Sequence, residues 1–392
     1  MQINETADVV IIGAGAVGAA CAYFAAQSGL RVHVVERGSI AGGTTSACEG
    51  NLLVSDKEAG HELDLSLYSQ RVWREDLAEL GPLWEFESKG GLVVSASEEG
   101  AEALTALTRR QRAAGIEVTG VPGDQLNDYE PHISTDLAAG AFYPQDAQVQ
   151  PMLVTAHLLR LARDRGAKVS TGTAVTGFLR EGDRVTGVTT AFGTISAPVV
   201  VNAAGTWAGQ VAQLAGVEVP VLPRRGFVLV TEPLPLTIHH KVYAGEYVAN
   251  VLSSEEGLQT SPVIEGTRSG TVLIGSSRER VGFDQTVSLP VLATMAVKAI
   301  ALFPLLRRVK VMRSYLGFRP YCPDHLPVIG PDPRAPGLWH ASGHEGAGIG
   351  LSTGTAKLLT QALTGSVVDL DLAPFAPERF APERFEKALA VH

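Results

Sequence analysis

Residues 9–36 constrain the fold more than any other part of this chain. Four apolar residues, Val9–Ile12, precede the glycine-rich run 13–18, which reads GAGAVG. An alanine-rich segment with the composition of a helix follows, and Arg31–Val35 has the pattern of a second strand that ends at Glu36. A short continuous apolar run indicates a strand buried on both faces, so we expect a parallel βαβ unit here.

The spacing of three glycines and one acid in this unit matches a dinucleotide-binding fingerprint. Gly13 permits a tight turn, Gly15 lets the backbone approach a pyrophosphate, and Gly18 lets the helix pack closely on the strand. Phosphates sit at the helix N-terminus, and Glu36 can accept hydrogen bonds from ribose hydroxyls. Glycine clusters often mark only turns, but the strand, helix and acid together favour a bound dinucleotide. The fingerprint alone leaves FAD and NAD open.

Composition narrows the class of protein. The 392 residues are 45% hydrophobic and 19% charged, with a formal net charge of −9. This length and composition predict two or three globular domains. There is no long basic stripe, so we expect no nucleic-acid partner. The three cysteines are far apart and form no CxxC, so we expect no metal site and a cytoplasmic location. No apolar run is long enough for a membrane span.

Hydrophobic periodicity predicts the order of the remaining elements. Helices are expected at 61–80, 98–115, 151–166, 290–302 and 350–363. Strands are expected at 91–95, 168–171, 174–180, 184–190, 199–201, 226–231, 242–251, 259–263, 271–276 and 338–342. Residues 121–150 are rich in Gly, Pro and Asp and are expected to be irregular. The middle block therefore indicates an antiparallel sheet inserted into the nucleotide-binding domain.

Five further motifs occur in a fixed order along the chain. They are GGTTS at 42–46, VVNAAGTW at 200–207, GFRP at 317–320, PVIG at 327–330 and GHEGAGIG at 343–350. Together with the fingerprint they resemble the D-amino acid oxidase family of FAD-dependent oxidoreductases. That family includes glycine oxidase, sarcosine oxidase and the flavin subunits of proline, hydroxyproline and opine dehydrogenases. The resemblance covers nearly the whole chain.

The resemblance implies an α/β fold with two domains. One is a Rossmann-like FAD-binding domain of the glutathione-reductase/p-hydroxybenzoate-hydroxylase type, made of residues 1–85, 150–215 and 320–392. The other is an inserted antiparallel-sheet substrate domain, made of residues 86–149 and 216–319. A nucleotide-binding domain rebuilt from three pieces of chain argues against the alternative of an NAD-dependent dehydrogenase.

The resemblance also implies where FAD would lie. Ala16 and Val17 would face the pyrophosphate, Glu36 and Arg37 the adenosine ribose, and Val175 the adenine. The remaining residues that it assigns to the cofactor site are Thr44, Thr45, Ser46, Glu49, Gly50, Asn51, Ala204, Gly205, Trp207, His344, Glu345, Gly346, Ala347, Gly348, Ile349 and Gly350. Backbone N–H groups at a helix start would stabilise negative charge on a reduced flavin at residues 344–350. The position of the cysteine that carries covalent FAD in sarcosine oxidases falls at Gly317, so we expect non-covalent FAD.

Arg319, in the GFRP motif, is the predicted substrate-binding residue. In amino-acid-oxidising relatives this arginine holds the substrate carboxylate, for which a guanidinium offers two parallel hydrogen bonds. An ion pair with Asp324 is the structural alternative. Tyr243 and Tyr247 fall where a tyrosine often helps to hold the carboxylate, or they are core residues. Glu49 would lie beside the flavin ring and hold a cationic group of the substrate, or turn to solvent. His344 would contact flavin or substrate, or would only cap a helix.

The reaction implied is oxidation of the C–N bond of a carboxylate-bearing amine or amino acid, with hydride transfer to flavin N5. No residue is predicted to act as a base. An alternative makes this chain the catalytic flavin subunit of a heteromeric dehydrogenase that passes electrons to a partner rather than to oxygen. We also expect that this chain can form a homo-oligomer. A non-catalytic flavin-binding subunit is the remaining class.

Overall fold

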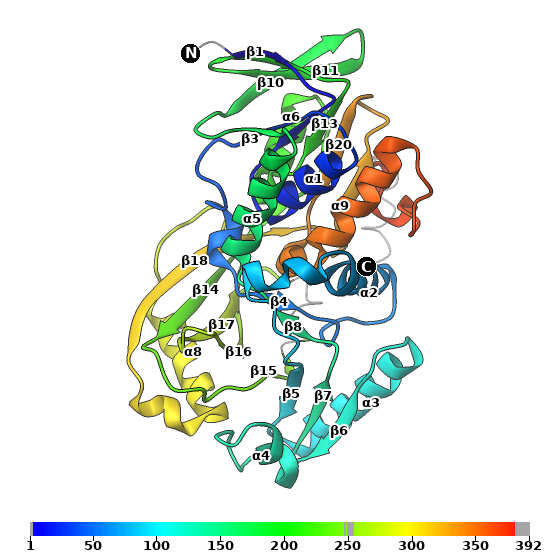
Figure 1. Cartoon of the computed structure of the whole chain (residues 1–392). Helices are drawn as coiled ribbons and strands as arrows, with labels where there is room; N and C mark the ends of the chain where they lie inside the picture. The colour runs from blue at the N-terminus through cyan, green and yellow to red at the C-terminus, as the bar shows by residue number, and fades with distance from the viewer. Residues whose placement is uncertain (1–2, 247, 249–254, 381–392) are drawn as a thin grey trace.

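The computed structural model describes residues 3–246, 248 and 255–380, and it has two parts (Figure 1). The first, which we call the Rossmann-like part, is built on a six-stranded sheet of order β19-β20-β13-β2-β3-β9. Its strands are parallel except for β19 at the edge, which runs antiparallel to β20. The strands are β2 (Val9–Ile12), β3 (Val32–Val35), β9 (Lys168–Ser170), β13 (Val199–Asn202), β19 (Val328–Pro331) and β20 (Leu338–Ser342).

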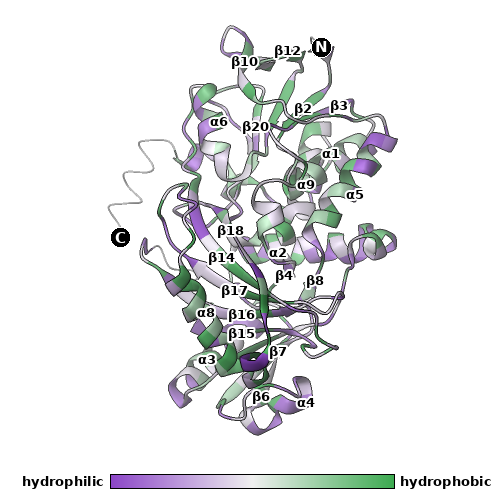
Figure 2. Ribbon diagram, turned by 90° about the vertical axis from the view of Figure 1, so that its left-hand side faces the viewer, coloured by the Kyte–Doolittle hydropathy of each residue, from purple (hydrophilic) through white to green (hydrophobic). Residues whose placement is uncertain are grey.

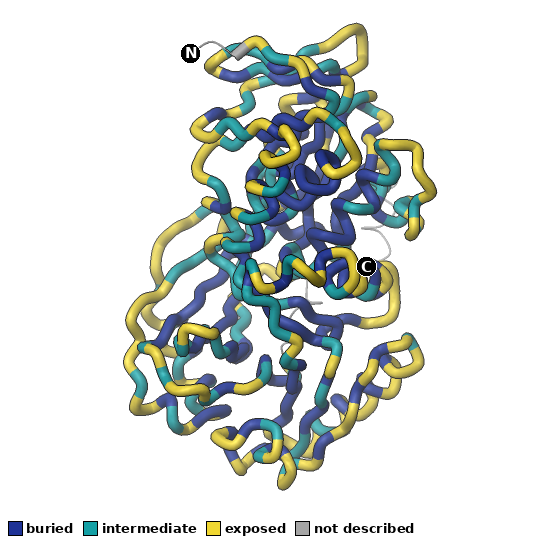
Figure 3. Tube along the Cα trace, viewed as in Figure 1, coloured by how far each residue is buried: buried dark blue, intermediate teal, exposed yellow. Residues whose placement is uncertain are grey.

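Both faces of the six-stranded sheet are covered, which explains its continuous apolar strands. Val9 and Ile11 pack with the helices of one face, whereas Val10 and Ile12 belong to the core of the other. The first face carries helices α1 (Ala16–Gln27), α5 (Pro151–Asp164) and α9 (Gly348–Thr364). The central strands β2, β3 and β13 are almost entirely buried (Figure 3), and β2 is coloured hydrophobic in Figure 2. The alternation follows from the two-residue period of a strand.

The second face of that sheet is covered by α6 (Ala208–Leu214) and a four-stranded sheet of order β1-β12-β11-β10. Its strands are β1 (Ile3–Thr6), β10 (Val175–Glu181), β11 (Arg184–Thr190) and β12 (Gly193–Ser196). The antiparallel pairing of β10, β11 and β12 confirms the predicted meander.

The second part, which we call the eight-stranded part, contains a sheet of order β18-β14-β17-β16-β15-β5-β7-β6. Its strands are β5 (Gly91–Ser95), β6 (Thr119–Pro122), β7 (Ala139–Tyr143), β14 (Leu222–Thr231), β15 (Lys241–Ala244), β16 (Gln259–Gly266), β17 (Val272–Arg278) and β18 (Val311–Tyr321). Helices α3 (Glu98–Ala113), α4 (Leu126–Tyr129) and α8 (Leu289–Leu302) accompany it (Figure 1).

This sheet is mixed, so the expectation of a purely antiparallel sheet is wrong. Strand β5 runs parallel to β15, whereas the other neighbours pair antiparallel. A parallel pair needs a long crossover connection. The chain supplies it here because between β5 and β15 it returns to build α5, β9 and β13 of the Rossmann-like part. The predicted domain boundaries stay predictions.

Three local expectations are corrected by the structure. Residues 121–150 are not irregular, because they contain α4, β7 and the short strand β8 (Ala147–Gln148), which pairs with β4 (Asn51–Leu52). The helix expected at 61–80 ends early: α2 (His61–Arg71) passes into a π-helical turn (Val72–Asp76) and then a 3₁₀ segment (Ala78–Trp84) that contains Pro82. Strand β15 ends at Ala244, and residues 247 and 249–251 of the strand expected at 242–251 lie outside the described residues.

Within residues 3–246, 248 and 255–380, no helix combines the length and the apolar character needed to cross a membrane. The same ranges hold no group of three or more His, Cys, Asp or Glu side chains arranged to bind a metal ion. Cys21, Cys48 and Cys322 are all free thiols.

Candidate active site

One large cavity, of about 690 Å³, extends from the glycine fingerprint to the eight-stranded sheet. Its walls come from both parts of the molecule, including the start of α1, the 42–51 segment and strands β14 and β18. Of the predicted cofactor residues, those lining it are Gly13, Gly15, Ala16, Val17, Glu36, Arg37, Thr44, Thr45, Glu49, Asn51, Val175, Ala204, Gly205, Trp207, His344, Glu345, Gly346, Gly348 and Ile349. The substrate candidate Arg319 lines the same cavity.

The fingerprint glycines have the steric roles that their spacing predicts. Gly13 has a φ of 111°, and a Cβ atom there would lie 2.5 Å from the carbonyl oxygen of Ala203. A Cβ atom on Gly18 would lie 2.0 Å from the carbonyl oxygen of Gly13, so only glycine lets α1 approach the turn. The cavity wall at this turn is therefore bare backbone at a helix N-terminus, which suits a pyrophosphate.

Glu36 is fixed by the turn itself. Its two carboxylate oxygens accept hydrogen bonds from the N–H groups of Ala14 (2.8 Å) and Gly38 (2.7 Å). Each oxygen keeps a further lone pair for another donor. The acid at the end of β3 is thus pre-oriented at the cavity edge, as the fingerprint predicts for a residue that meets a ribose.

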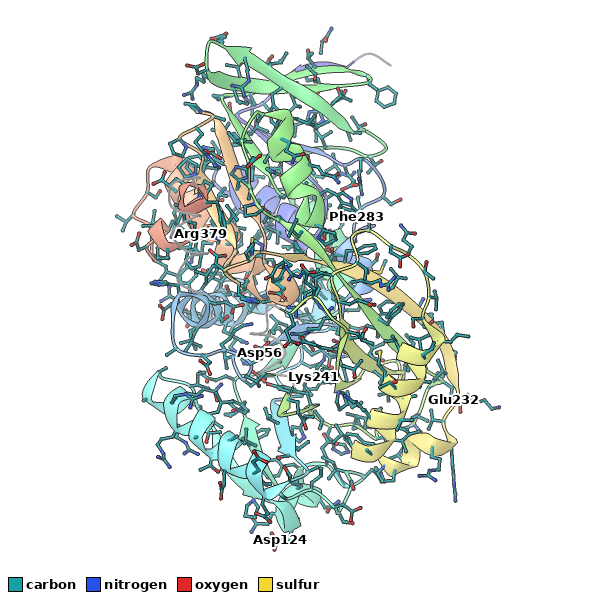
Figure 4. All side chains as sticks on the ribbon, turned by 180° about the vertical axis from the view of Figure 1, so that it is seen from behind. Asp56, Asp124, Glu232, Lys241, Phe283 and Arg379 are labelled. Carbon is teal, nitrogen blue, oxygen red and sulfur yellow. The ribbon has the colours of Figure 1, made fainter. Side chains whose placement is uncertain are left out.

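Arg37 and Trp207 form a stacked wall near this end of the cavity. The guanidinium of Arg37 lies 3.9 Å from the Trp207 ring centre, and Trp207 stacks on Phe283 with centroids 5.4 Å apart and planes at 8°. Phe283 follows β17 in the chain and lies beside the Rossmann-like part (Figure 4). Sequence reasoning named Arg37 and Trp207 but not Phe283.

The threonines of the 42–46 motif join the two parts. The Thr45 hydroxyl accepts the N–H of Ala16 at 3.0 Å, at the start of α1. Thr44 and Thr206 both donate to the Phe318 carbonyl oxygen in β18, at 2.6 and 2.7 Å. These contacts place β18, and therefore the neighbouring Arg319, beside the nucleotide-binding turn.

Five predicted cofactor residues do not line this cavity. Ser46 is exposed and donates to the Gly43 carbonyl, while Gly50 packs against the Val149 carbonyl, to which a Cβ would come within 1.8 Å. Gly18 serves packing, as described. The two others, Ala347 and Gly350, line a small neighbouring cavity with Asn51. Ala347 and Gly350 therefore lie next to the large cavity and not in its wall.

The turn at 344–350 is held by buried polar contacts. His344 is 3% exposed and its Nε2 lies 2.9 Å from the Thr355 hydroxyl; burial lowers the pKa of His344 to about 3, so the imidazole is neutral. Glu345 accepts hydrogen bonds from Arg224 at 2.6 Å and pairs with His325 at 3.0 Å. Burial opposes ionisation, but His325, Arg224 and Arg278 hold the pKa of Glu345 below its usual value.

Arg319 projects from β18 into the cavity. Its Nη1 donates to the Ser277 carbonyl oxygen at 2.8 Å, and a Cβ on Gly226 would lie 2.2 Å from that nitrogen. A Cβ on Gly346 would lie 3.7 Å from the Arg319 Cδ, so the arginine reaches the turn at 344–350. The alternative ion pair with Asp324 does not form, because Asp324 pairs with Arg379 at 2.6 Å.

Glu49 lies in a buried charged cluster rather than in solvent. Its side chain is 9% exposed, and its Oε1 is 3.8 Å from Nζ of Lys241, which in turn lies 2.7 Å from Glu265. Sequence reasoning missed Lys241 and Glu265. The sequence did carry a signal for both. Lys241 begins the apolar strand pattern KVYA and Glu265 ends the pattern PVIE, and charged residues placed next to buried apolar residues indicate a buried ion pair.

The two tyrosine candidates differ in outcome. Tyr243 is buried and hydrogen-bonds to the Ser55 hydroxyl away from the cavity lining, so it is a core residue. Tyr247 lies outside the described residues.

Comparisons with known proteins agree with this geometry. Residues 8–362 match the DAO family, described as FAD dependent oxidoreductase. The hydrogen cyanide synthase subunit HcnC of Pseudomonas aeruginosa is 29% identical over 433 residues, covering 99% of this chain and 100% of that protein. The glycine oxidase of Pseudomonas putida is 29% identical over 385 residues, covering 94% and 98%.

The solved structures agree on the fold. The crystal structure of glycine oxidase from Geobacillus kaustophilus superposes with a TM-score of 0.87 at 26% identity, covering 96% of this chain and 99% of that one. The predicted α/β architecture, an FAD-binding domain with an inserted sheet domain, is thereby confirmed, with a mixed sheet in place of the antiparallel one. The chain belongs to the DAO family of FAD-dependent oxidoreductases, and it is an enzyme that acts on amino acids or amines.

Proposed function

We propose that this enzyme oxidises the C–N bond of a carboxylate-bearing amine, an amino acid or N-substituted amino acid, with FAD bound non-covalently. The observation that carries the proposal is Arg319, a guanidinium that lines the same cavity as the dinucleotide fingerprint. A substrate carboxylate paired with this guanidinium would be held within the cavity that the cofactor shares. Such placement converts binding energy into orientation of the reacting carbon.

The residues present fit FAD. Bare glycine backbone at the start of α1 would receive the pyrophosphate, Glu36 the ribose, and the 344–350 turn the flavin ring. FAD, when bound, supplies the acceptor for the hydride that leaves the substrate carbon. The protein contributes orientation, exclusion of water and backbone N–H groups aimed at the flavin.

The state of the cavity cysteine supports non-covalent binding. Cys48 is the one thiol among the described cavity-lining residues, and its Sγ donates to the Thr45 carbonyl at 3.3 Å. Burial, with the charges of Glu265 and Glu49, raises the pKa of Cys48 to about 12. Only a thiolate is a competent nucleophile, so this thiol is poorly suited to form a covalent flavin link. Acid precipitation should therefore release all flavin into the supernatant.

Substitution of Arg319 tests the substrate assignment. Loss of a buried charged hydrogen-bond partner costs roughly 2–4 kcal/mol, so Arg319→Ala should lower kcat/KM about 30- to 1,000-fold. Arg319→Lys should recover only part of this, because lysine cannot form the two-pronged contact. The measurement is anaerobic flavin bleaching against D-amino acids, sarcosine, proline and hydroxyproline isomers, and opines. Arg313→Ala, an exposed residue on the same strand, is the control. Unchanged turnover in Arg319→Ala refutes the assignment.

A second form of this function is a subunit that passes electrons to a partner. It is favoured by the 29% identity to HcnC, which is named as a subunit. The chain has three cysteines, one fewer than a four-cysteine iron–sulfur cluster needs, so the next carrier would belong to another chain. Oxygen consumption by the purified chain at the rate of dye reduction would favour an oxidase. Dye reduction without oxygen consumption would favour the subunit.

A further inference from the structure

The Glu49 carboxylate has an unusual environment for a residue in a substrate cavity. Lys241, Glu265 and Glu49 form a cluster in which the side chains are 2%, 2% and 9% exposed. Lys241 lies in the middle of the molecule, where the eight-stranded sheet meets the Rossmann-like part (Figure 4). Burying two carboxylates costs free energy unless each is paired.

The hydrogen bonds of the cluster satisfy one carboxylate better than the other. Glu265 accepts from Lys241 at 2.7 Å and from the N–H of Gly50 at 3.3 Å. Glu49 accepts only a long bond to Oε2 from Asn51, at 3.4 Å. Within the described chain no donor lies in hydrogen-bonding range of its buried Oε1. Glu49 therefore retains an acceptor in a cavity where water is restricted.

Glu49 and Arg319 line the same cavity and contact neighbouring positions of β17. A Cβ on Gly275 would lie 2.5 Å from Glu49 Oε1, and Arg319 donates to the carbonyl of Ser277. The two side chains are close enough for the charge of Arg319 to lower the pKa of Glu49. In an α-amino acid a single carbon separates the carboxylate from the amine. The cavity thus presents a cation and an anion near each other, as the two ends of a zwitterion require.

We propose that Glu49 accepts the ammonium proton of a zwitterionic substrate whose carboxylate is held by Arg319, and that Lys241 and Glu265 are positioning residues for it. This inference rests on the proposed function. The proton passes from the substrate nitrogen to Glu49 Oε1, leaving a neutral amine and a neutral carboxylic acid. No carbon bond changes and no electron is transferred in this step. The neutral amine, with its free lone pair, is the form that can release a hydride from the adjacent carbon.

Electrostatics favour this direction of transfer. Burial raises the pKa of Glu49, and Glu265 raises it further, while Lys241 and Arg319 act in the opposite direction. Two neutral groups also cost less to bury than an ion pair that lacks further hydrogen bonds. The other titratable groups facing Glu49 are Tyr315 and Cys48, and burial raises the pKa of both, so they stay neutral and do not compete for the proton.

The first test is the pH dependence of anaerobic flavin reduction in Glu49→Gln. The parent enzyme should use the zwitterion, so its kcat/KM should vary little between about pH 7 and the pKa of the substrate amine. The variant can use only free amine, so its kcat/KM should fall about tenfold for each pH unit below that pKa. Glu87→Gln, which removes a partly exposed acid paired with Arg268 in the same part, should keep the parent profile.

The second test measures binding without turnover. Perturbation of the flavin spectrum gives Kd for 2-aminoisobutyrate, which has no α-hydrogen, and for isobutyrate, which has no amine. The parent enzyme should prefer the amino acid, and Glu49→Gln should lose at least tenfold of that preference. Lys241→Met should raise the pH at which the acid limb of the profile appears, and Lys241→Arg should restore it. Flavin content and circular dichroism identify the variants that fold. If Glu49→Gln does not fold, Glu49→Asp is the second substitution at this position.

Two outcomes overturn the inference. One is a Glu49→Gln holoenzyme with the parent pH profile and amine preference. The other is a variant that changes only the flavin spectrum or FAD affinity, which would make Glu49 a cofactor contact. Failure of the proposed function is distinguishable, because then no carboxylated amine would bleach the flavin of the parent enzyme at all.

Discussion

At the scale of single residues, the buried charges of this protein are the positions where environment changes chemistry most. Glu49, Glu345 and Asp146 are all carboxyl groups shielded from water, yet their surroundings push them in different directions. Glu345 has cations on two sides and its pKa is lowered, whereas the pKa values of Glu49 and Asp146 are raised by burial. Residue type and the number of hydrogen-bond donors do not determine these pKa values, because Asp146 accepts three hydrogen bonds and its pKa is still raised. What distinguishes Glu345 is the set of cations around it.

Asp146 gives a prediction about stability and pH. It is fully buried, and burial raises its pKa to about 7 although Ser55 and the N–H of Val54 hydrogen-bond to it. The folded state therefore binds this proton more tightly than the unfolded chain, whose group has a pKa near 3.8. The contribution is complete below about pH 4 and is lost as pH rises to about 7. Asp146→Asn, which resembles the protonated acid, should lack this loss.

The measurement is the midpoint of thermal unfolding at pH 5 and pH 8. The decrease in Tm between these two pH values should be smaller in Asp146→Asn than in the parent protein. Asp136→Asn, which removes an exposed carboxyl group, is the control and should show the parent decrease. An equal decrease in all three proteins would show that Asp146 does not titrate in this range.

At the scale of elements, prediction from sequence succeeded where the signal is local. The apolar run of β2 and the glycine spacing before α1 are consecutive in the chain, and both elements form where expected. It failed at 121–150, where β7 is a strand despite its glycine, because Gly140 packs against the side chain of Leu126 and the neighbouring β5 pairs with it. Pairing between distant strands overrides local propensity.

The site shows the same division. The fingerprint and Arg319 lie in recognisable motifs and line one cavity. The partners of Glu49 do not, since Lys241 lies 192 positions along the chain and meets it only through the fold of β15. Phe283, which stacks on Trp207, likewise follows β17 in the other part of the molecule. Contacts between the two parts could not be predicted from either segment alone.

Gly18 gives a prediction at the junction of α1 with the fingerprint turn. In Gly18→Ala the new Cβ would meet backbone atoms of Gly13 at 2.0 and 3.0 Å, and backbone cannot move aside as a side chain can. Helix α1 must shift from the turn, so FAD affinity should fall at least about tenfold, in line with a strain cost of roughly 1–3 kcal/mol. Titration of the apoprotein with FAD, followed by flavin fluorescence, measures this. Gly120→Ala, where no atom lies within 4 Å, should bind FAD normally.

At the scale of the whole molecule, the active site exists only where the two parts meet. The cavity has walls from both, and β18 carries Arg319 while its Phe318 carbonyl receives Thr44 and Thr206 of the Rossmann-like part. A second connection is the ion pair between Arg224 in β14 and Glu345 in the turn before α9, with 1% and 11% of the side chains exposed. The substrate side and the flavin side are thus fixed to each other by buried polar contacts.

The Arg224–Glu345 pair therefore gives a prediction about coupling between the parts. Removing one partner of a buried pair takes the main counter-charge from the other and costs up to about 3–5 kcal/mol. Glu345→Gln should be the more damaging change because Arg224 then faces the like charge of Arg278. The double variant Arg224→Met/Glu345→Gln should be less destabilised than the sum of the singles, by roughly 1–3 kcal/mol. Denaturant unfolding of the parent protein, the two single variants and the double variant measures this coupling.

As a control, Asp164→Asn breaks an exposed pair with Arg160 and should cost no more than about 1 kcal/mol of unfolding free energy. Additive single effects would mean that the Arg224–Glu345 pair does not couple the two parts.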